Sequence, residues 1–79
     1  MFYYTYVLKS KVDNKLYIGF TSDLKKRLTE HNNGKNESTK LRRPLVLVYF
    51  EGCLNKNRAI KREKYFKTGF GRRYLKDRI

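Results

Sequence analysis

The sequence contains one cysteine, one histidine, one proline and no tryptophan. A single cysteine cannot form an internal disulfide, and together with a single histidine it cannot supply the four ligands of a structural zinc site. We therefore expect a protein of the reducing cytoplasm. Cys53 is expected to pack as a small buried hydrophobic residue rather than to act as a nucleophile.

Long hydrophobic runs are absent as well. No apolar stretch approaches the roughly 18 residues that a membrane-spanning helix needs, so no contact with a membrane is expected. The first residues, Met1-Phe2-Tyr3-Tyr4, lack the basic region and the apolar stretch of a secretory signal peptide. Both absences favour a cytoplasmic location.

Acidic residues are scarce, because 7 Asp and Glu stand against 20 Lys and Arg, which gives a net charge of +13 over 79 residues. Such an excess attracts polyanions, of which nucleic acid is the commonest, although a solvated charged surface is the simpler reading. The basic residues occur along the whole chain, and 7 Tyr and 5 Phe exclude a typical disordered composition. We therefore expect one basic folded domain over residues 1–79.

Three segments have the pattern of strands. Aromatic and β-branched residues predict strands over residues 2–9 and 15–20, joined by a short turn with Asp13-Asn14 at its tip. The short connection favours an antiparallel hairpin. Residues 45–50 form a continuous apolar run that predicts a central strand.

Three helices are expected, over residues 24–32, 56–68 and 71–79. Asp23 can cap the first helix and Asn55 the second. A glycine follows each of these two helices, Gly34 the first and Gly69 the second. The resulting order is ββαβαα, which predicts an α/β fold with helices covering a small sheet.

An acidic residue stands out in the second predicted helix. Helical spacing places Glu63 on the same face as Ala59, Ile60 and Phe66, the face that is expected to meet the core. A carboxylate there needs a cationic partner. The partner is either an Arg or Lys side chain or a divalent ion such as Mg²⁺, which one carboxylate can hold when water and substrate phosphate complete its shell.

The first predicted helix carries Arg27 and His31 one turn apart, beside its apolar stripe. Arginine suits bidentate contact with phosphate, whereas a lone histidine is often only a buried hydrogen-bonding residue. The hairpin is rich in tyrosine, which in strands usually forms core or cross-strand pairs. Its tyrosines are Tyr3, Tyr4, Tyr6 and Tyr17.

An ordered set of these residues resembles the GIY-YIG nuclease superfamily. Tyr6 is followed by Tyr17-Ile18-Gly19, Arg27, His31 and a helical glutamate, Glu63, at matching spacings. The resemblance covers nearly the whole chain and is to small stand-alone bacterial members, most of them uncharacterised. It implies a three-stranded antiparallel sheet flanked by helices, and hydrolysis of phosphodiester bonds with one divalent ion, Mg²⁺ or Mn²⁺.

The resemblance implies a role for each member of the set. Glu63 matches the metal-binding glutamate and Arg27 the arginine that contacts phosphate. Tyr6 and Tyr17 match the two tyrosines of which one helps to deprotonate the attacking water. Ile18 matches the motif isoleucine, and Gly19 matches the glycine that allows a close backbone approach. His31 matches a histidine that serves proton transfer or phosphate contact.

The chain departs from the family pattern at two points. Its first triplet reads Tyr4-Thr5-Tyr6, without glycine or isoleucine, and no asparagine follows Asn57, although many family nucleases carry one well after the glutamate. The implied function is a metal-dependent DNA endonuclease, structure-selective and active in repair or recombination. The alternative is a non-catalytic nucleic-acid-binding module on the same fold, and a third reading is a basic subunit of a larger complex.

Further contacts to nucleic acid are expected from the polar loop over residues 34–43 and from the last helix. Ordinary solvated charge is the other reading of these positions. The candidate residues are Lys35, Lys40, Arg42, Arg43, Arg72 and Arg73.

Overall fold

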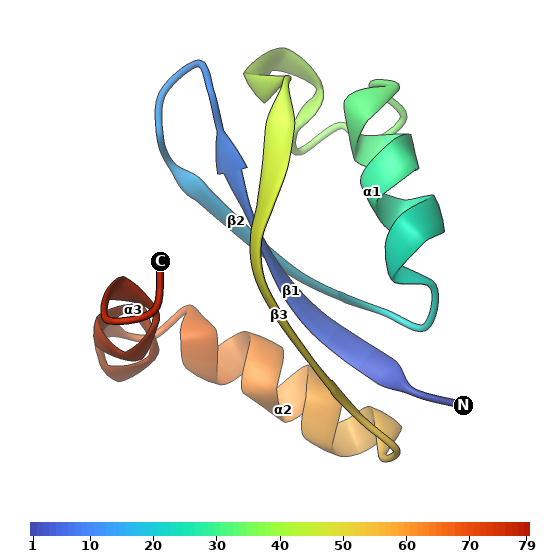
Figure 1. The fold of residues 1–79 in the computed structure, drawn as a ribbon, viewed down its shortest axis with the longest axis vertical. Helices are drawn as coiled ribbons and strands as arrows, with labels where there is room; N and C mark the ends of the chain where they lie inside the picture. Colours follow the sequence, from blue (N-terminus) through green and yellow to red (C-terminus); the bar gives the residue numbers. More distant parts are fainter.

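The computed structural model describes all 79 residues and has the expected order ββαβαα (Figure 1). A short 3₁₀ turn over Lys40–Arg42 precedes the third strand. The elements are β1 (Tyr3–Ser10), β2 (Leu16–Thr21), α1 (Leu24–Asn32), β3 (Leu45–Cys53), α2 (Lys56–Phe66) and α3 (Gly69–Lys76). None of the helices is long and apolar enough to cross a membrane.

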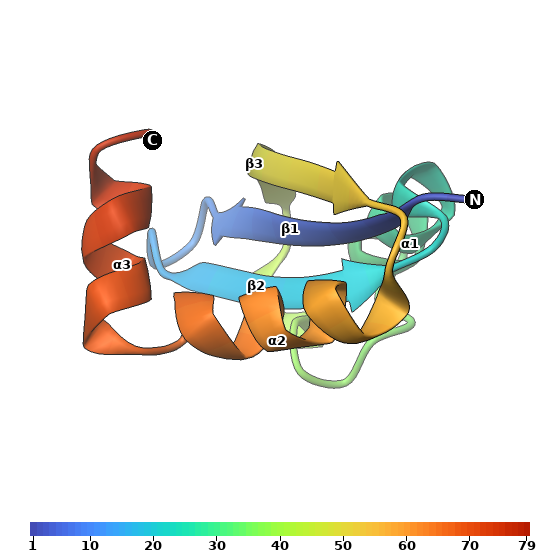
Figure 2. The same ribbon diagram turned by 90° about the horizontal axis from the view of Figure 1, so that it is seen from below.

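The three strands form an antiparallel sheet in the order β2-β1-β3, as Figure 2 shows. The expectation that residues 45–50 form the central strand was wrong, because β1 is central and β3 lies at an edge. Val46 is 40% exposed and Phe50 is 51% exposed. Both faces of β3 are partly covered, so apolar residues occur at successive positions. The alternation of apolar and polar residues that marks a strand with one buried face is therefore absent.

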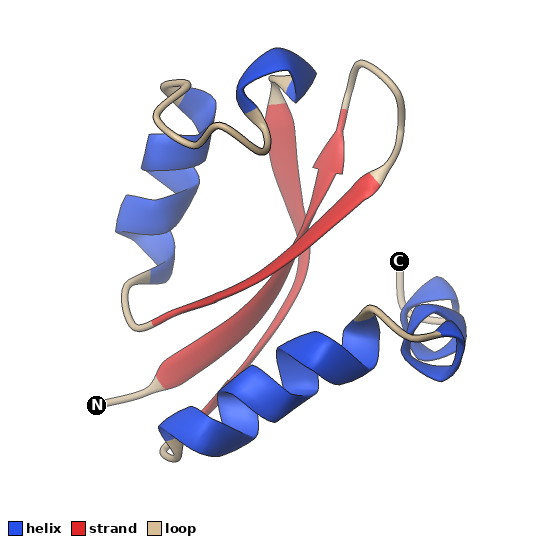
Figure 3. Ribbon diagram, turned by 180° about the vertical axis from the view of Figure 1, so that it is seen from behind, coloured by secondary structure: helices blue, strands red, loops and turns tan.

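Helices cover both faces of the sheet: α1 lies on one side, and α2 and α3 lie on the other (Figure 3). Successive residues of β1 therefore enter two different cores. Tyr6 and Leu8 pack under α1, whereas Val7 packs with Phe66 of α2 and Leu75 of α3.

The caps of the first two helices confirm the predicted starts. The Asp23 carboxylate accepts from the Lys26 N–H at 3.1 Å, and the Asn55 side chain accepts from the Arg58 N–H at 3.1 Å. These bonds satisfy backbone donors that have no partner within the helix.

The boundary between the last two helices was predicted wrongly. Gly69 does not end α2, which stops at Phe66; it is the first residue of α3. The Thr68 hydroxyl caps α3 by accepting from the Gly71 N–H at 3.1 Å. Gly71 must be glycine here because a Cβ would collide with the Tyr65 carbonyl.

Cys53 is only half-buried, contrary to expectation. It is the last residue of the edge strand β3, where the chain turns toward α2, and its Sγ donates to the Asn55 carbonyl at 3.2 Å. The end of an edge strand has fewer neighbours than the sheet centre, which explains its exposure.

Candidate active site

A buried chain of hydrogen bonds joins three separate segments beneath α1. The Tyr6 hydroxyl of β1 lies 3.0 Å from Nε2 of His31 on α1, and His31 Nδ1 lies 2.7 Å from the Thr39 hydroxyl. Tyr6 is 2% exposed, and both His31 and Thr39 are 0% exposed. The chain is therefore shielded from water along its whole length.

Gly19 provides the space that Tyr6 occupies. The two residues are directly opposite each other in the β1–β2 pairing, and a Cβ at Gly19 would collide with the Tyr6 phenol. The close approach at this glycine is thus made by a side chain rather than by another backbone segment. Ile18, its neighbour, faces the other side of the sheet and is 6% exposed in the core with Val7 and Phe66.

Tyr17 of β2 lies on the same face of the sheet as Tyr6. It is opposite Leu8 in the pairing, and its ring centroid is 5.0 Å from that of His31 and 6.5 Å from that of Tyr6. Unlike Tyr6, Tyr17 is only partly buried. Tyr17 is therefore the more accessible of the two phenols.

Arg27 occupies the flank of α1 that faces β2. The opposite flank is fixed by Asn32, whose side-chain amide accepts from the Leu45 N–H at 2.8 Å and donates to the Leu45 carbonyl at 3.0 Å. Because Leu45 belongs to β3, the helical period places Arg27 and Glu30 on the β2 side. The Arg27 Nε lies 4.0 Å from the Glu30 carboxylate, and the Arg27 side chain is 42% exposed.

Glu63 approaches from the other face of the sheet. α2 packs over β1 and β2, and the Thr5 hydroxyl of β1 donates to the Ala59 carbonyl at 2.9 Å. The Glu63 side chain is 21% exposed and accepts from the Lys67 ammonium at 3.2 Å, within the same helix. Of the two expected partners for this carboxylate, the structure contains the lysine.

Burial and nearby charged groups on both faces of the sheet shift the pKa of Tyr6. Burial raises the pKa of Tyr6 well above its usual value, and Tyr17, Glu63 and Glu30 raise it further, while Arg27 lowers it. Glu63 on α2 and Arg27 on α1 are therefore both within electrostatic range of one phenol. The residues in direct contact are Tyr6, Tyr17 and His31, and they lie on the face of the sheet that α1 covers.

The surroundings of His31 favour the neutral form of its imidazole. Burial lowers the pKa of its imidazole below 6.5, Arg27 lowers it further, and Glu30 opposes both. A neutral, fully buried imidazole with both nitrogens engaged is not placed to bind a phosphate. Of the two roles expected for His31, the geometry does not favour contact with phosphate, and proton transfer stays a prediction.

A cation at this site would have one carboxylate, Glu63, as its protein ligand. No group of three or more His, Cys, Asp or Glu side chains comes together in the structure. A single hard oxygen ligand on a half-buried helix flank fits Mg²⁺ or Mn²⁺ only where water and substrate phosphate complete the coordination shell. The residues therefore fit a metal ion that binds together with the nucleic acid better than an ion that binds to the free protein.

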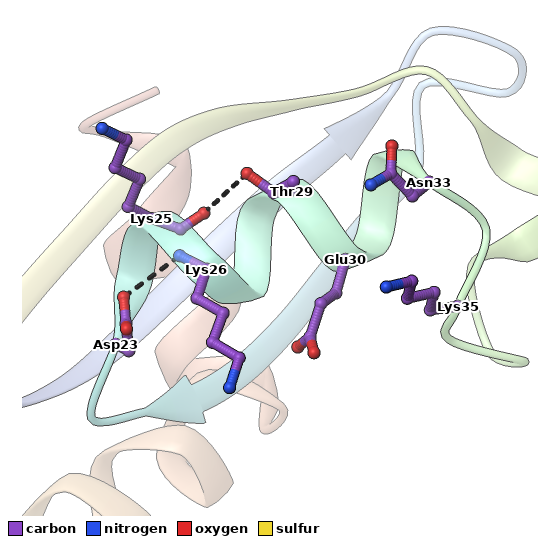
Figure 4. A pocket seen from close by; sticks show the side chains of 7 residues that line it. All are labelled: Asp23, Lys25, Lys26, Thr29, Glu30, Asn33 and Lys35. Atoms are coloured by element: carbon purple, nitrogen blue, oxygen red, sulfur yellow. Dashed lines mark hydrogen bonds between the residues drawn. The ribbon is translucent and has the colours of Figure 1, made fainter.

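Basic residues line the outer side of α1 next to the site. Figure 4 shows a hollow in which Lys26 and Glu30 project from one side of the helix and Lys25 from the other. Lys35 also lines this hollow. A second, polar hollow includes Arg27 itself, together with Thr21, Ser22, Asp23, Lys26 and Glu30.

The other predicted nucleic-acid contacts fall into two groups. Lys40, Arg72 and Arg73 are exposed, and the Arg73 guanidinium lies 5.8 Å from the Phe70 ring centroid. Arg42 and Arg43, in contrast, each have a partner within the protein. Arg42 Nε lies 3.5 Å from the Asp13 carboxylate, and Arg43 Nε donates to the Lys40 carbonyl at 2.9 Å.

Two residues of the site were not predicted. Glu30 could have been found, because it follows Arg27 at a spacing of three on one helix, where opposite charges meet. Thr39 carried no signal, since it is one polar residue within a polar loop. Only the fold shows that its hydroxyl reaches His31.

Comparisons with known proteins identify the family of the chain. Residues 2–75 match the family described as the GIY-YIG catalytic domain. The chain is 44% identical over 75 residues to a UPF0213 protein of Staphylococcus saprophyticus, covering 94% of this chain and 90% of that protein. It is 46% identical over 66 residues to the UPF0213 protein YazA of Bacillus subtilis, covering 82% and 66% respectively.

A solved structure is also similar. The solution NMR structure of a UPF0213 protein from Bacillus halodurans matches with a TM-score of 0.60 at 30% sequence identity, covering 98% of this chain and 84% of that one. The antiparallel three-stranded sheet and its flanking helices are thus confirmed as the fold that the resemblance implied. The chain belongs to the GIY-YIG catalytic domain family and is similar to the bacterial UPF0213 proteins within it.

Proposed function

We propose that this protein is a metal-dependent nuclease that hydrolyses phosphodiester bonds in DNA. The single observation that supports the proposal is the cluster of Tyr6, Tyr17 and His31 on one face of the sheet, with Arg27 on the same helix as His31. Glu63 lies on α2, which packs against the other face. The net charge of +13 supports a polyanionic substrate. A preference for nicked or branched DNA, as in repair or recombination, is part of the proposal.

Tyr17 is assigned to the attacking water. Tyr6 is buried, bonded to His31 and raised in pKa, so its phenol stays protonated and does not reach a water molecule. Tyr17 is half-buried, and its phenolate form would accept a proton from a water molecule as the water oxygen attacks phosphorus and the bond from phosphorus to the leaving sugar oxygen breaks.

Arg27 and Glu63 are assigned to the phosphate. Arg27 is exposed enough to donate two hydrogen bonds to the phosphoryl oxygens as negative charge develops on them. Glu63, released from Lys67, would hold the divalent ion. When bound, such an ion supplies Lewis-acid stabilisation of the phosphoryl oxygens and of the leaving oxygen.

The test is cleavage of labelled single-stranded, nicked and branched DNA by the purified protein with Mg²⁺ or Mn²⁺. Glu63→Ala and Tyr17→Phe should each lower kcat by about 100-fold or more, the usual effect of losing a metal ligand or a general base. Glu37→Ala, at an exposed acidic residue of the loop, is the matched control and should retain full activity. Failure of highly purified protein to cleave any member of the panel contradicts the proposal.

A non-catalytic nucleic-acid-binding module is the second candidate, and the Glu63–Lys67 pair favours it. In this case Lys67 is the lasting partner of the carboxylate. Glu63→Ala would then leave DNA affinity unchanged or increase it, and no cleavage would occur. Affinity would fall steeply with added salt, because binding to phosphates releases counterions.

A further inference from the structure

Thr39 lies outside the family motif, yet its side chain ends the buried chain that begins at Tyr6. We propose that Thr39 is a positioning residue, which keeps the imidazole hydrogen of His31 on Nδ1 so that Nε2 accepts the hydroxyl hydrogen of Tyr6. The proposal rests on the proposed function for its effect on cleavage. Its structural part, the tautomer of His31, stands independently.

The direction of the hydrogen bonds follows from the acidities of the groups. A phenol is far more acidic than an aliphatic hydroxyl, and the unprotonated nitrogen of imidazole is a good acceptor. The Tyr6 hydroxyl therefore donates to Nε2 across the 3.0 Å separation. A neutral imidazole has one N–H, which must then be on Nδ1 and donate to the Thr39 oxygen 2.7 Å away.

Thr39 is itself held in place by the backbone on both sides. Its N–H donates to the Asn36 carbonyl at 3.2 Å, and its carbonyl accepts from the Arg42 N–H at 2.9 Å. The Arg42 carbonyl in turn accepts from the Ser10 hydroxyl at 2.6 Å, at the end of β1. The loop over residues 34–43 is thus part of the scaffold of the site, in addition to any contact it makes with nucleic acid.

The position of His31 determines the position of both phenols. Its ring lies 5.9 Å from that of Tyr6 and 5.0 Å from that of Tyr17, edge to face in each case. Rotation of the imidazole would break its hydrogen bond to the Tyr6 hydroxyl and change the surface against which the Tyr17 ring packs. Loss of the Thr39 hydroxyl should therefore lower kcat while leaving DNA affinity nearly unchanged.

The experiment uses the wild-type protein, Thr39→Val, Thr39→Ser and the control Thr29→Val. Valine has nearly the shape of threonine without the hydroxyl, and serine keeps the hydroxyl. Thr29 is exposed on α1, and its hydroxyl donates only to the Lys25 carbonyl, at 3.0 Å. Long-range ¹H–¹⁵N NMR reports the imidazole tautomer, and the assignment is unambiguous because the chain has one histidine.

We expect wild-type protein, Thr39→Ser and Thr29→Val to show the tautomer with hydrogen on Nδ1. Thr39→Val should show a mixture of tautomers and a kcat reduced about tenfold, the lower end of what is lost when the partner that orients a metal-ligating histidine is removed. DNA affinity measured in EDTA should change less than twofold. Hydrogen on Nε2 in the wild type overturns the proposal without any variant, even if Thr39→Val fails to fold.

An unchanged tautomer with an unchanged kcat in Thr39→Val also overturns it. Absence of cleavage by the wild type refutes the proposed nuclease function instead. The tautomer measurement still decides whether Thr39 orients His31, so the two failures are distinguishable.

Discussion

Gly19→Ala is a severe single-methyl change next to the candidate site. The added Cβ would lie 2.5 Å from Cζ of Tyr6, and the ring cannot retreat because it is 2% exposed and bonded to His31. Forcing an extra methyl group into a packed core costs about 1–3 kcal/mol. If the ring moves and the bond to His31 breaks, the unsatisfied buried atoms cost a further ~1–3 kcal/mol.

The predicted loss of unfolding free energy is therefore about 2–6 kcal/mol. A domain of this length has a total stability of about 4–12 kcal/mol, so the change is a large fraction of it. The melting temperature should fall by about 10 °C or more. Urea and thermal unfolding followed by circular dichroism measure both quantities.

Gly69→Ala is the matched control, because no atom lies within 4 Å of a Cβ at that position. Gly69 is the first residue of α3, where alanine is neutral or slightly stabilising. Combining Gly19→Ala with Tyr6→Phe, which removes the hydroxyl nearest the new methyl, should cost at least ~0.5 kcal/mol less than the sum of the two single changes. A Gly19→Ala protein within about 0.5 kcal/mol of wild type would refute the steric reasoning.

Three further results are expected. The pKa of His31 is lowered in the folded state, so the stability that this residue contributes is complete above pH 6.5 and declines as the pH falls toward the folded pKa. Urea unfolding between pH 7.5 and 5 should therefore show a loss of unfolding free energy that His31→Gln abolishes. Lys67→Met should change the unfolding free energy by less than about 0.5 kcal/mol, as for an exposed ion pair. It should also tighten Mn²⁺ binding at Glu63 in electron paramagnetic resonance titrations, and an unchanged Mn²⁺ affinity would show that Lys67 does not compete with the ion for the carboxylate. Arg42→Ala should lower the unfolding free energy by about 1 kcal/mol, because Arg42 is paired with Asp13. Lys40→Ala should leave the unfolding free energy unchanged and weaken DNA binding, and equal stabilities of the two variants would contradict the structural role of Arg42.

Local signals predicted the order of elements and most of their boundaries. The capping residues Asp23 and Asn55 act within one helical turn of themselves, so they can be identified without knowledge of the fold. The position of β3 in the sheet could not be predicted in this way. A continuous apolar run requires partial cover on both faces, and an edge strand between α1 and α2 satisfies that requirement as well as a central strand does.

The region around Gly69 shows a limit of a different kind. Glycine is a common signal for the end of a helix, but a threonine directly before it can cap a new helix, and the two signals compete. Here the Thr68 cap determined where α3 begins. The sequence contained both signals, and only the packing of Gly71 against the Tyr65 carbonyl shows why the new helix starts so soon.

The residues of the candidate site could be predicted from the sequence, but their burial and their contacts could not. The resemblance to the family supplied the five positions at which chemistry is proposed. It did not distinguish the buried phenol of Tyr6 from the more accessible phenol of Tyr17, because that difference depends on the pairing of β1 with β2 and on the cover by α1. Burial also raises the pKa of Tyr6 by more than the Arg27 guanidinium lowers it, and burial is set by the fold.

The paired hydrogen bonds between Asn32 and Leu45 have a consequence for how α1 can move. The amide takes the place that a fourth strand would fill at the start of β3, and so it anchors the C-terminal end of the helix to the sheet. Two neighbouring residues, His31 facing inward and Asn32 facing sideways, thus act as a clamp. Because Leu24 and Leu28 pack against the core nearer the other end, the nine-residue helix is attached to the sheet on both sides of Arg27.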